Sequence, residues 1–205
     1  MVEYFNNGGA FMYPILAFFI FGLAFALERL YTLTMSSINT KKFLKEVNET
    51  LDSGGVEEAV ELCNKTRGPV AEIFHAGLTR VDRGIGEVEK AIQNAGTLEM
   101  AFLEKNMIWL NAVVTVAPML GFTGTVVGMI KAFDDIKAAN DISPAVVAGG
   151  ISIALLTTAF GLIVAIIIQF FQNFFVSRID KLIFDMEENS VILIDKLVEL
   201  ESTKK

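Results

Sequence analysis

The chain has 205 residues, of which 53% are hydrophobic and 20% are charged, and its mean hydropathy is +0.51. A soluble domain of this length is normally less apolar, so the composition favours a membrane protein. The net charge is −7, whereas a nucleic-acid-binding protein needs a basic face, so the sequence predicts no nucleic-acid partner.

Three runs without charged residues are long enough to cross a membrane as helices. They extend over 4–27, 106–130 and 142–177, and about 20 apolar residues span a hydrocarbon core of ~30 Å. The first run has no basic residue before it and no Ala-x-Ala-like cleavage site after it, and Glu28-Arg29 follow directly. We therefore expect a retained membrane helix rather than a removable signal peptide.

Lysine and arginine are distributed unevenly around these runs. None precedes the first run, whereas nine lie in 36–106, one in 134–141 and five from residue 178 onward. Cytoplasmic segments beside membrane helices keep an excess of these residues, so the long insert and the tail are predicted inside and the N-terminus outside. The predicted segments are an outer N-terminus over 1–9, membrane helices over 10–33, 107–133 and 144–177, a cytoplasmic helical domain over 34–106, a short outer loop over 134–143 and a cytoplasmic C-terminal helix over 178–205.

Glycine and proline divide the predicted cytoplasmic domain into helices. Apolar residues recur at helical spacing over 40–51, 56–65 and 70–81. Pro69 is well placed as the first residue of the third of these helices, where its missing amide hydrogen costs little.

Two helices are predicted to continue across the membrane boundary. After Gly86 no proline or turn cluster appears before Pro118, so we expect one uninterrupted helix into the second span. The third charge-free run has 36 residues, more than a bilayer requires, and is expected to emerge as a continuous helix. Beyond it an apolar stripe continues at Ile179, Leu182, Met186, Leu193 and Leu197. Such a stripe needs partner helices, and self-association is the simplest source of them.

The sequence offers no catalytic or metal-binding group. Cys63 and His75 are the only cysteine and the only histidine. A single cysteine permits no intrachain disulfide and is expected to be buried and structural, while His75 lacks the neighbours of a metal site. Without a nucleophile–base pair or a phosphate-binding loop, neither an enzyme nor a cofactor is predicted.

Small residues and threonines share one face on each of the second and third predicted spans. On the second span these are Pro118, Gly121, Thr125 and Gly128, with Gly124 completing a Gly-x-x-x-Gly motif. On the third span they are Ile151, Ala154, Thr158, Gly161 and Ala165, with Gly150 and Thr157 about one step around the helix. Two interpretations remain open: close helix packing, in which each hydroxyl bonds its own backbone, and the lining of an ion pathway.

The second and third charge-free runs contain no ionisable side chain. Proton relays in membranes usually depend on such groups, and a threonine hydroxyl does not titrate near neutral pH. A carboxylate for proton transfer must therefore come from another chain, and sodium is also better held by hydroxyls beside a borrowed carboxylate. Asp134, Asp135 and Asp141 lie in the predicted outer loop, where they either attract cations or form a solvated acidic surface.

Two stretches resemble the signatures of a known family. LGFTGTVVGMIKAF over 120–133 is similar to the second-span signature of the MotA/TolQ/ExbB proton-channel family, and VAGGISIALLTTAFGLIVAI over 147–166 is similar to its third-span signature. Arg67-Gly68-Pro69 before a helix, and three spans with one large insert, resemble the ExbB/TolQ branch. The resemblance implies an all-α protein of the bacterial inner membrane that forms a ring-shaped homopentamer, with a periplasmic N-terminus and a cytoplasmic C-terminus.

The resemblance also implies partners and site residues. The second and third spans would line a pore that holds a dimer of single-span ExbD/TolR-like proteins, each bringing one membrane aspartate, with a TonB/TolA-like effector beyond them. Thr125 and Thr158 match the family's two pore threonines, and Thr157 is assigned to the same pathway. The residues assigned to packing of the pore helices are Pro118, Gly121, Gly124, Gly128, Gly150, Ala154 and Gly161.

Two positions depart from the family's common pattern. Ile153 stands where many ExbB members have a glutamate, and Thr157 stands where alanine is common in proton-driven members. A Thr-Thr pair without the glutamate resembles sodium-driven stator units. The implied function is a stator channel subunit that couples cation flow to mechanical work, with the proton favoured and sodium as the alternative. A non-conducting membrane scaffold, in which the threonines only pack, is the competing class.

Overall fold

A computed structural model describes residues 2–36, 40–139 and 144–203. Its elements in chain order are α1 (Val2–Asn7), α2 (Met12–Ser36), α3 (Thr40–Ser53), α4 (Gly55–Lys65), α5 (Pro69–Leu78), the 3-10 helix η1 (Val81–Arg83), α6 (Ile85–Glu104), α7 (Met107–Ala139) and α8 (Pro144–Thr203). No β-strand occurs in these three ranges, so the all-α fold class is confirmed for them.

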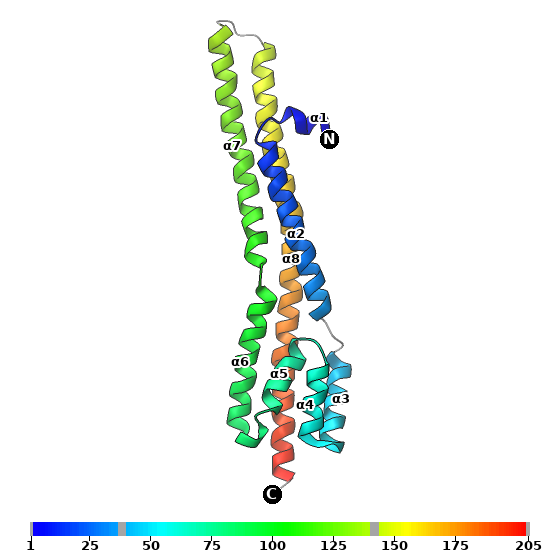
Figure 1. The fold of residues 1–205 in the computed structure, drawn as a ribbon. Helices are drawn as coiled ribbons and strands as arrows, with labels where there is room; N and C mark the ends of the chain where they lie inside the picture. Colours follow the sequence, from blue (N-terminus) through cyan, green and yellow to red (C-terminus); the bar gives the residue numbers. More distant parts are fainter. Residues whose placement is uncertain (1, 37–39, 140–143, 204–205) are drawn as a thin grey trace. The chain divides into compact units, whose positions relative to one another are not determined.

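The helices form two compact units. Unit 1 comprises Met1–Arg29 and Asn106–Phe174, and unit 2 comprises Leu30–Lys105 and Phe175–Lys205. Both α2 and α8 contribute residues to each unit. In unit 1 the helices α2, α7 and α8 lie side by side, whereas α3 to α6 belong to unit 2 (Figure 1).

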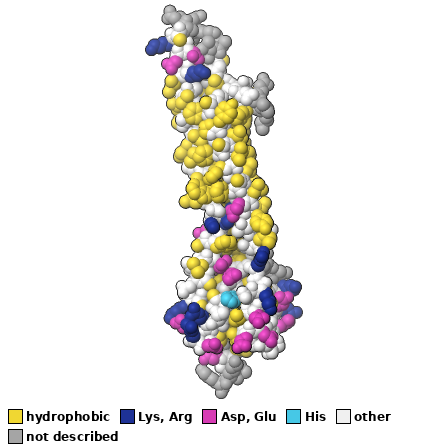
Figure 2. Space-filling model, in the orientation of Figure 1, with side chains coloured by type: hydrophobic (Ala, Val, Ile, Leu, Met, Phe, Trp, Pro, Cys, Tyr) yellow, Lys and Arg dark blue, Asp and Glu magenta, His cyan; other side chains and the backbone are white. Residues whose placement is uncertain are grey.

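Unit 1 contains the membrane-spanning parts of three helices. The described residues include three helical stretches that are long and apolar enough to cross a membrane, and they contain the apolar parts of α2, α7 and α8. Large apolar side chains are exposed along them, among them Phe122, Ile166 and Phe170, which expose 68%, 67% and 76% of their surface. Figure 2 shows this surface in yellow, while most charges gather over unit 2. Lipid would cover such a surface, which supports three membrane spans.

A glycine and an aromatic contact bring α2 against α7 and α8. A Cβ atom at Gly22 would lie 2.9 Å from Ile168 and 3.2 Å from Val113, so a larger residue would push the helices apart. Nearby, the ring centroids of Phe21 and Trp109 are 6.0 Å apart with the rings perpendicular, an arrangement that aromatic pairs favour. These contacts fix α2 beside the helix pair that carries the predicted site.

The backbones of α7 and α8 touch because both helices lack large side chains where they meet. A Cβ atom added at Gly121 would lie 2.9 Å from the carbonyl oxygen of Thr157 and 3.0 Å from the Cα atom of Thr158. One added at Gly161 would lie 2.6 Å from the carbonyl oxygen of Ala117. Side-chain atoms do not come so close to a backbone, so glycine at these positions sets the spacing of the two helices.

The same contact continues along the antiparallel pair. Its further pairs are Gly124 with Thr157, Gly128 with Ala154, and Gly150 with Ala132. Small residues therefore line α7 from Ala117 to Ala132 and α8 from Gly150 to Gly161. Lipid tails are as apolar as the side chains, so burying apolar surface between helices gains little in a membrane. Close packing of this kind is therefore a main source of attraction between membrane helices.

α6 and α7 are separate helices, so the prediction of one uninterrupted helix is wrong. α6 ends at Glu104, α7 begins at Met107, and Asn106 between them has a φ of +66°. Asparagine adopts this left-handed conformation more readily than other residues with a Cβ, so the helix ends without glycine or proline. The carbonyl oxygen of Asn106 accepts a hydrogen bond of 3.1 Å from the amide of Trp109, which starts the next helix.

α8 is a single helix of 60 residues, which confirms that the third span continues as a helix beyond the membrane segment. The predicted stripe residues Ile179, Met186, Leu193 and Leu197 are each 4% exposed or less, and Leu182 is half-buried. Within unit 2, Lys196 Nζ also lies 3.0 Å from a carboxylate oxygen of Asp52 in α3. The stripe packs within the chain and gives no argument for self-association.

The core of unit 2 lies between α3, α4, α5, α6 and the part of α8 that carries the buried stripe. Phe43 and Val47 of α3 are buried, and the ring of Phe43 lies 5.7 Å from that of Phe74 in α5. A Cβ atom at Gly77 would lie 2.8 Å from Ile92, so this glycine permits the close approach of α5 and α6.

The short helices of unit 2 differ little from their prediction. α3 and α4 cover the predicted ranges 40–51 and 56–65 to within two residues, and Pro69 is the first residue of α5 as predicted. The third helix was predicted over 70–81 but ends at Leu78. The 3-10 turn η1 and Gly84, with a φ of +92°, follow it and reverse the chain into α6.

Cys63 lies in the core of unit 2 and should be chemically inert. Its side chain is 2% exposed, and burial, together with the negative charge of Glu72, raises the pKa of its thiol to about 12. Because the thiolate is the reactive form, the folded protein at pH 8 should not react with a water-soluble disulfide reagent, whereas the protein unfolded in detergent should react fully. The absorbance of the released thiolate measures both. Rapid reaction of the folded protein would contradict the buried position.

Alanine at Gly161 should weaken the α7–α8 contact, because its Cβ would meet the backbone of Ala117. Gly149 of the same helix is the matched control, since nothing lies within 4 Å of a Cβ added there. In purified protein, Gly161→Ala should lower the melting temperature by several degrees. Gly149→Ala should leave it unchanged or raise it, because alanine favours helix by about 1 kcal/mol over glycine. Equal melting temperatures for the two variants would contradict the described packing.

Candidate functional site

The two adjacent threonines of α8 have different surroundings. Thr157 is fully buried, its Oγ1 donates a hydrogen bond of 2.8 Å to the carbonyl oxygen of Ala154, and its side chain faces Gly124. Thr158 is half-buried, and its Oγ1 donates across the contact to the carbonyl oxygen of Gly121 in α7, at 3.1 Å. One hydroxyl is therefore satisfied within its own helix, while the other joins the two helices.

Thr125 lies one helical turn after Gly121, whose carbonyl oxygen Thr158 contacts. It is half-buried, and its Oγ1 donates a hydrogen bond of 2.6 Å to the carbonyl oxygen of Phe122. Each of these bonds uses the hydroxyl hydrogen, so the oxygen lone pairs can still accept a hydrogen bond or ligate a hard cation. Thr125 and Thr158 offer such oxygens at partly exposed positions, and Thr157 does not. The pathway role of all three stays a prediction.

The residues predicted to pack the pore helices lie at the α7–α8 contact or next to it. Those in the contact are Gly121, Gly124, Gly128, Gly150, Ala154 and Gly161. Pro118 is half-buried inside α7, beside Ala117. It has no backbone N–H to donate one turn back, and the helix nevertheless continues through it. That these residues pack the helices of a pore stays a prediction.

No carboxylate lies on the membrane parts of α7 and α8, and acidic groups occur at the end of α7. Asp134 and Asp135 are exposed in the last turns of this helix, where a loop was expected, and Asp141 lies outside the described residues. Ile153, which stands at the family's glutamate position, is half-buried, and its Cγ2 would be 3.4 Å from a Cβ added at Gly9. This position therefore contributes apolar contact and no charge.

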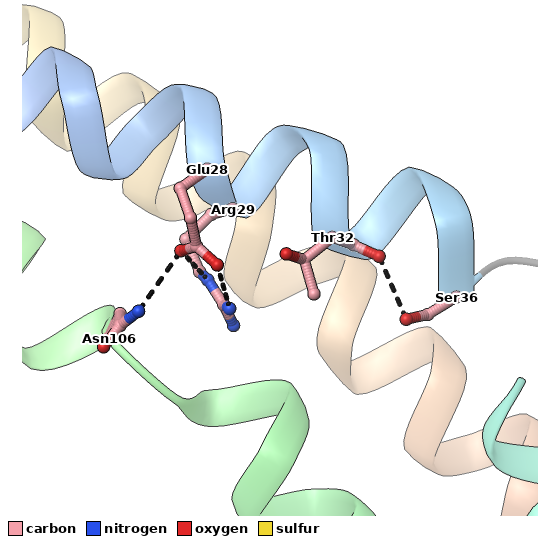
Figure 3. A network of polar contacts seen from close by, with 5 residues as sticks. All are labelled: Glu28, Arg29, Thr32, Ser36 and Asn106. Atoms are coloured by element: carbon pink, nitrogen blue, oxygen red, sulfur yellow. Dashed lines mark hydrogen bonds and ion pairs between the residues drawn. The ribbon is translucent and has the colours of Figure 1, made fainter.

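A polar cluster that was not predicted from the sequence lies at the other end of the membrane segments. Arg29 is 1% exposed, and its Nε and Nη2 each donate a hydrogen bond of 2.7 Å to the carboxylate of Glu28. The amide nitrogen of Asn106 lies 3.3 Å from the same carboxylate (Figure 3). The cluster ties the end of the membrane part of α2 to the residue before α7. Adjacent residues of a helix normally face different directions, so this pairing could not be predicted from the spacing of Glu28 and Arg29.

Comparisons with known proteins identify the family of the chain. The profile of the MotA/TolQ/ExbB proton channel family matches residues 65–188. An ExbB homologue of Methanothermobacter thermautotrophicus, named a biopolymer transport protein, is 35% identical over 88% of this chain and 64% of its own length. An ExbB-like biopolymer transport protein of Synechocystis is 28% identical over 82% of this chain and 81% of its own length.

A more distant match comes from the other named branch. The Tol-Pal system protein TolQ of Pseudomonas aeruginosa is 32% identical over 56% of this chain and 54% of its own length. The chain thus spans about two thirds or less of the length of two of these three relatives. Their names describe biopolymer transport proteins and a protein of the Tol-Pal system rather than enzymes. The chain belongs to the MotA/TolQ/ExbB proton channel family, on its ExbB/TolQ side.

Proposed function

We propose that the chain is an ExbB/TolQ-like stator subunit, which couples cation flow across the bacterial inner membrane to mechanical work by a partner protein. The observation that carries this proposal is the pair of hydroxyls of Thr125 and Thr158 on two closely packed helices whose charge-free runs, 106–130 and 142–177, contain no ionisable group. Such a pair can form the wall of a cation pathway, but it cannot itself hold a proton. The group that does so must come from another protein.

An ExbD/TolR-like single-span partner with one membrane aspartate meets this requirement. A carboxylate in a low-dielectric slot is costly in its charged form unless hydroxyls or water surround it. A bound cation removes this cost, and its release restores it. The partner's aspartate would therefore prefer different positions when loaded and unloaded, which is a physical basis for movement.

A ring of identical subunits would surround the partner, and family resemblance implies five of them. The exposed apolar faces of α7 and α8, with Phe122 and Leu155 at 68% and 65% exposure, are available to neighbouring copies and to lipid. The distribution of lysine and arginine supports a periplasmic N-terminus and a cytoplasmic C-terminus. A TonB/TolA-like effector would receive the work on the periplasmic side.

The proton is the favoured cation, and the position of Thr157 supports this preference. A Thr-Thr pair helps to ligate sodium only if both hydroxyls face the pathway. The hydroxyl of Thr157 is buried and bonded to Ala154. A sodium-driven unit is the second candidate, because Ile153 replaces the family's glutamate.

Loss of the threonine hydroxyls should reduce ion flux. Thr158→Val keeps the shape of the side chain but removes the hydroxyl that reaches Gly121, and Thr125→Val removes the second. A lost hydrogen-bonding ligand is worth ~1 kcal/mol or more, so flux should fall about five- to tenfold in each variant. Vesicles that contain the chain and its single-span partner, loaded with a pH-sensitive dye, measure this flux.

Thr123→Val is the matched control for these variants. Thr123 lies on the same helix as Thr125, is exposed, and its Oγ1 donates to the carbonyl oxygen of Met119 at 2.8 Å. Its flux should equal that of the unmodified protein, and intact oligomers are verified for every variant. Unchanged flux in both Thr158→Val and Thr125→Val would end the channel proposal and leave a non-conducting scaffold.

The choice of cation can be measured separately. At fixed pH and membrane potential, flux into the same vesicles should be equal in sodium-free and sodium-containing buffer, because a proton-driven unit needs no sodium ligand. Loss of flux without sodium would overturn the proton preference and favour the sodium-driven candidate.

A further inference from the structure

Two amide side chains, Asn111 of α7 and Gln172 of α8, lie between the threonines of these helices and the Glu28–Arg29 end of unit 1. Asn111 lies fourteen residues before Thr125 on α7, and Gln172 lies fourteen residues after Thr158 on α8. Fourteen residues are close to four helical turns, or about 21 Å, so each amide falls within about 40° of the face that carries its threonine. Because the helices are antiparallel, the two amides meet.

The amide pair crosses between the helices but is incompletely bonded. Gln172 Nε2 lies 3.5 Å from Asn111 Oδ1, at the limit of a hydrogen bond. Gln172 Oε1 is buried and has no hydrogen-bond partner among the described residues. A neighbouring amide pair behaves differently, since Gln169 donates a short bond of 2.7 Å to Asn173 within α8.

A buried amide oxygen without a partner is unfavourable. The cost is about 1–3 kcal/mol, and a side chain that served only to hold two helices together would avoid it by forming a complete bond. The oxygen therefore needs a water molecule, a cation or a donor from a neighbouring molecule. Its place on the threonine face of the helices favours the first two.

We propose that Asn111 and Gln172 form a second cation-binding site, the station, at the inner mouth of the pathway. A monovalent cation that leaves the two threonines would regain water there. This inference rests on the proposed function and adds a site to it. Amide oxygens are hard ligands that suit such an ion or its hydration shell, as carbonyls do in other cation sites. Amides do not titrate, so the station can pass a cation without retaining a proton. Sodium and hydronium share this chemistry.

Substitution of the amides in the complex with the single-span partner tests the station. Gln172→Met keeps length and removes both polar atoms, Asn111→Leu does the same on α7, and Gln169→Met is the matched control on the same helix. Proton flux and sodium flux are measured in vesicles with dyes specific for each ion. We expect a fall of about fivefold or more in Gln172→Met and Asn111→Leu, for whichever ion the unmodified complex conducts, and none in Gln169→Met.

A charged variant covers the case in which an apolar variant does not assemble. Gln172→Glu places a titratable carboxyl at the station, so flux should rise with pH relative to the unmodified protein as the carboxyl ionises and attracts cations. A pH profile identical to that of the unmodified complex would overturn the station. So would full flux in Gln172→Met and Asn111→Leu.

Thr158→Val in the same vesicles separates the two proposals. If Thr158→Val lowers flux while both amide variants conduct normally, the station is wrong and the stator function stands. If Thr158→Val and Thr125→Val conduct normally, the proposed function fails whatever the amide variants do. If threonine and amide variants all lose flux and the Gln169→Met control does not, both proposals are supported.

Discussion

The close approach of α7 and α8 is the constraint on which the rest of unit 1 depends. Backbone atoms form much of this contact, so the spacing of the helices depends on positions where a side chain is missing, such as Gly121 and Gly161. That spacing brings the hydroxyl of Thr158 to a carbonyl of the opposite helix and buries Thr157 completely. Successive helical residues point about 100° apart, and this rotation separates a packing threonine from a partly exposed one.

Polarity changes in steps along unit 1. Hydroxyls occur at Thr125 and Thr158, amides follow at Asn111 and Gln172, and full charges come with the pair of Glu28 and Arg29. The side chains become more polar at each step, as expected for helices that leave hydrocarbon for water. In the proposed pathway, a cation would pass from hydroxyl ligands to amide ligands along this gradient.

Much of this architecture could be predicted from the sequence, because charge-free length and helical periodicity are strong signals for spans and for the long α8. The break before α7 could not, since it depends on one asparagine in a left-handed conformation, and asparagine also occurs inside helices. The small-residue faces were visible, but which threonine faces the contact depends on how α7 and α8 are rotated about their axes. The hydrogen bonds of Arg29 and the unpartnered oxygen of Gln172 depend on tertiary geometry, which no spacing rule supplies.

The joint at Asn106 has a consequence for how chains of this kind can vary in length. An insertion within α8 would rotate every later residue by about 100° for each added position and turn the buried stripe outward. At residues 105–106 the helix is interrupted, because α6 ends at Glu104 and α7 begins at Met107. An added residue there would not rotate one helix relative to the other through a continuous helical turn. Of these two places, the joint is where residues could be gained or lost while both flanking helices keep their buried faces.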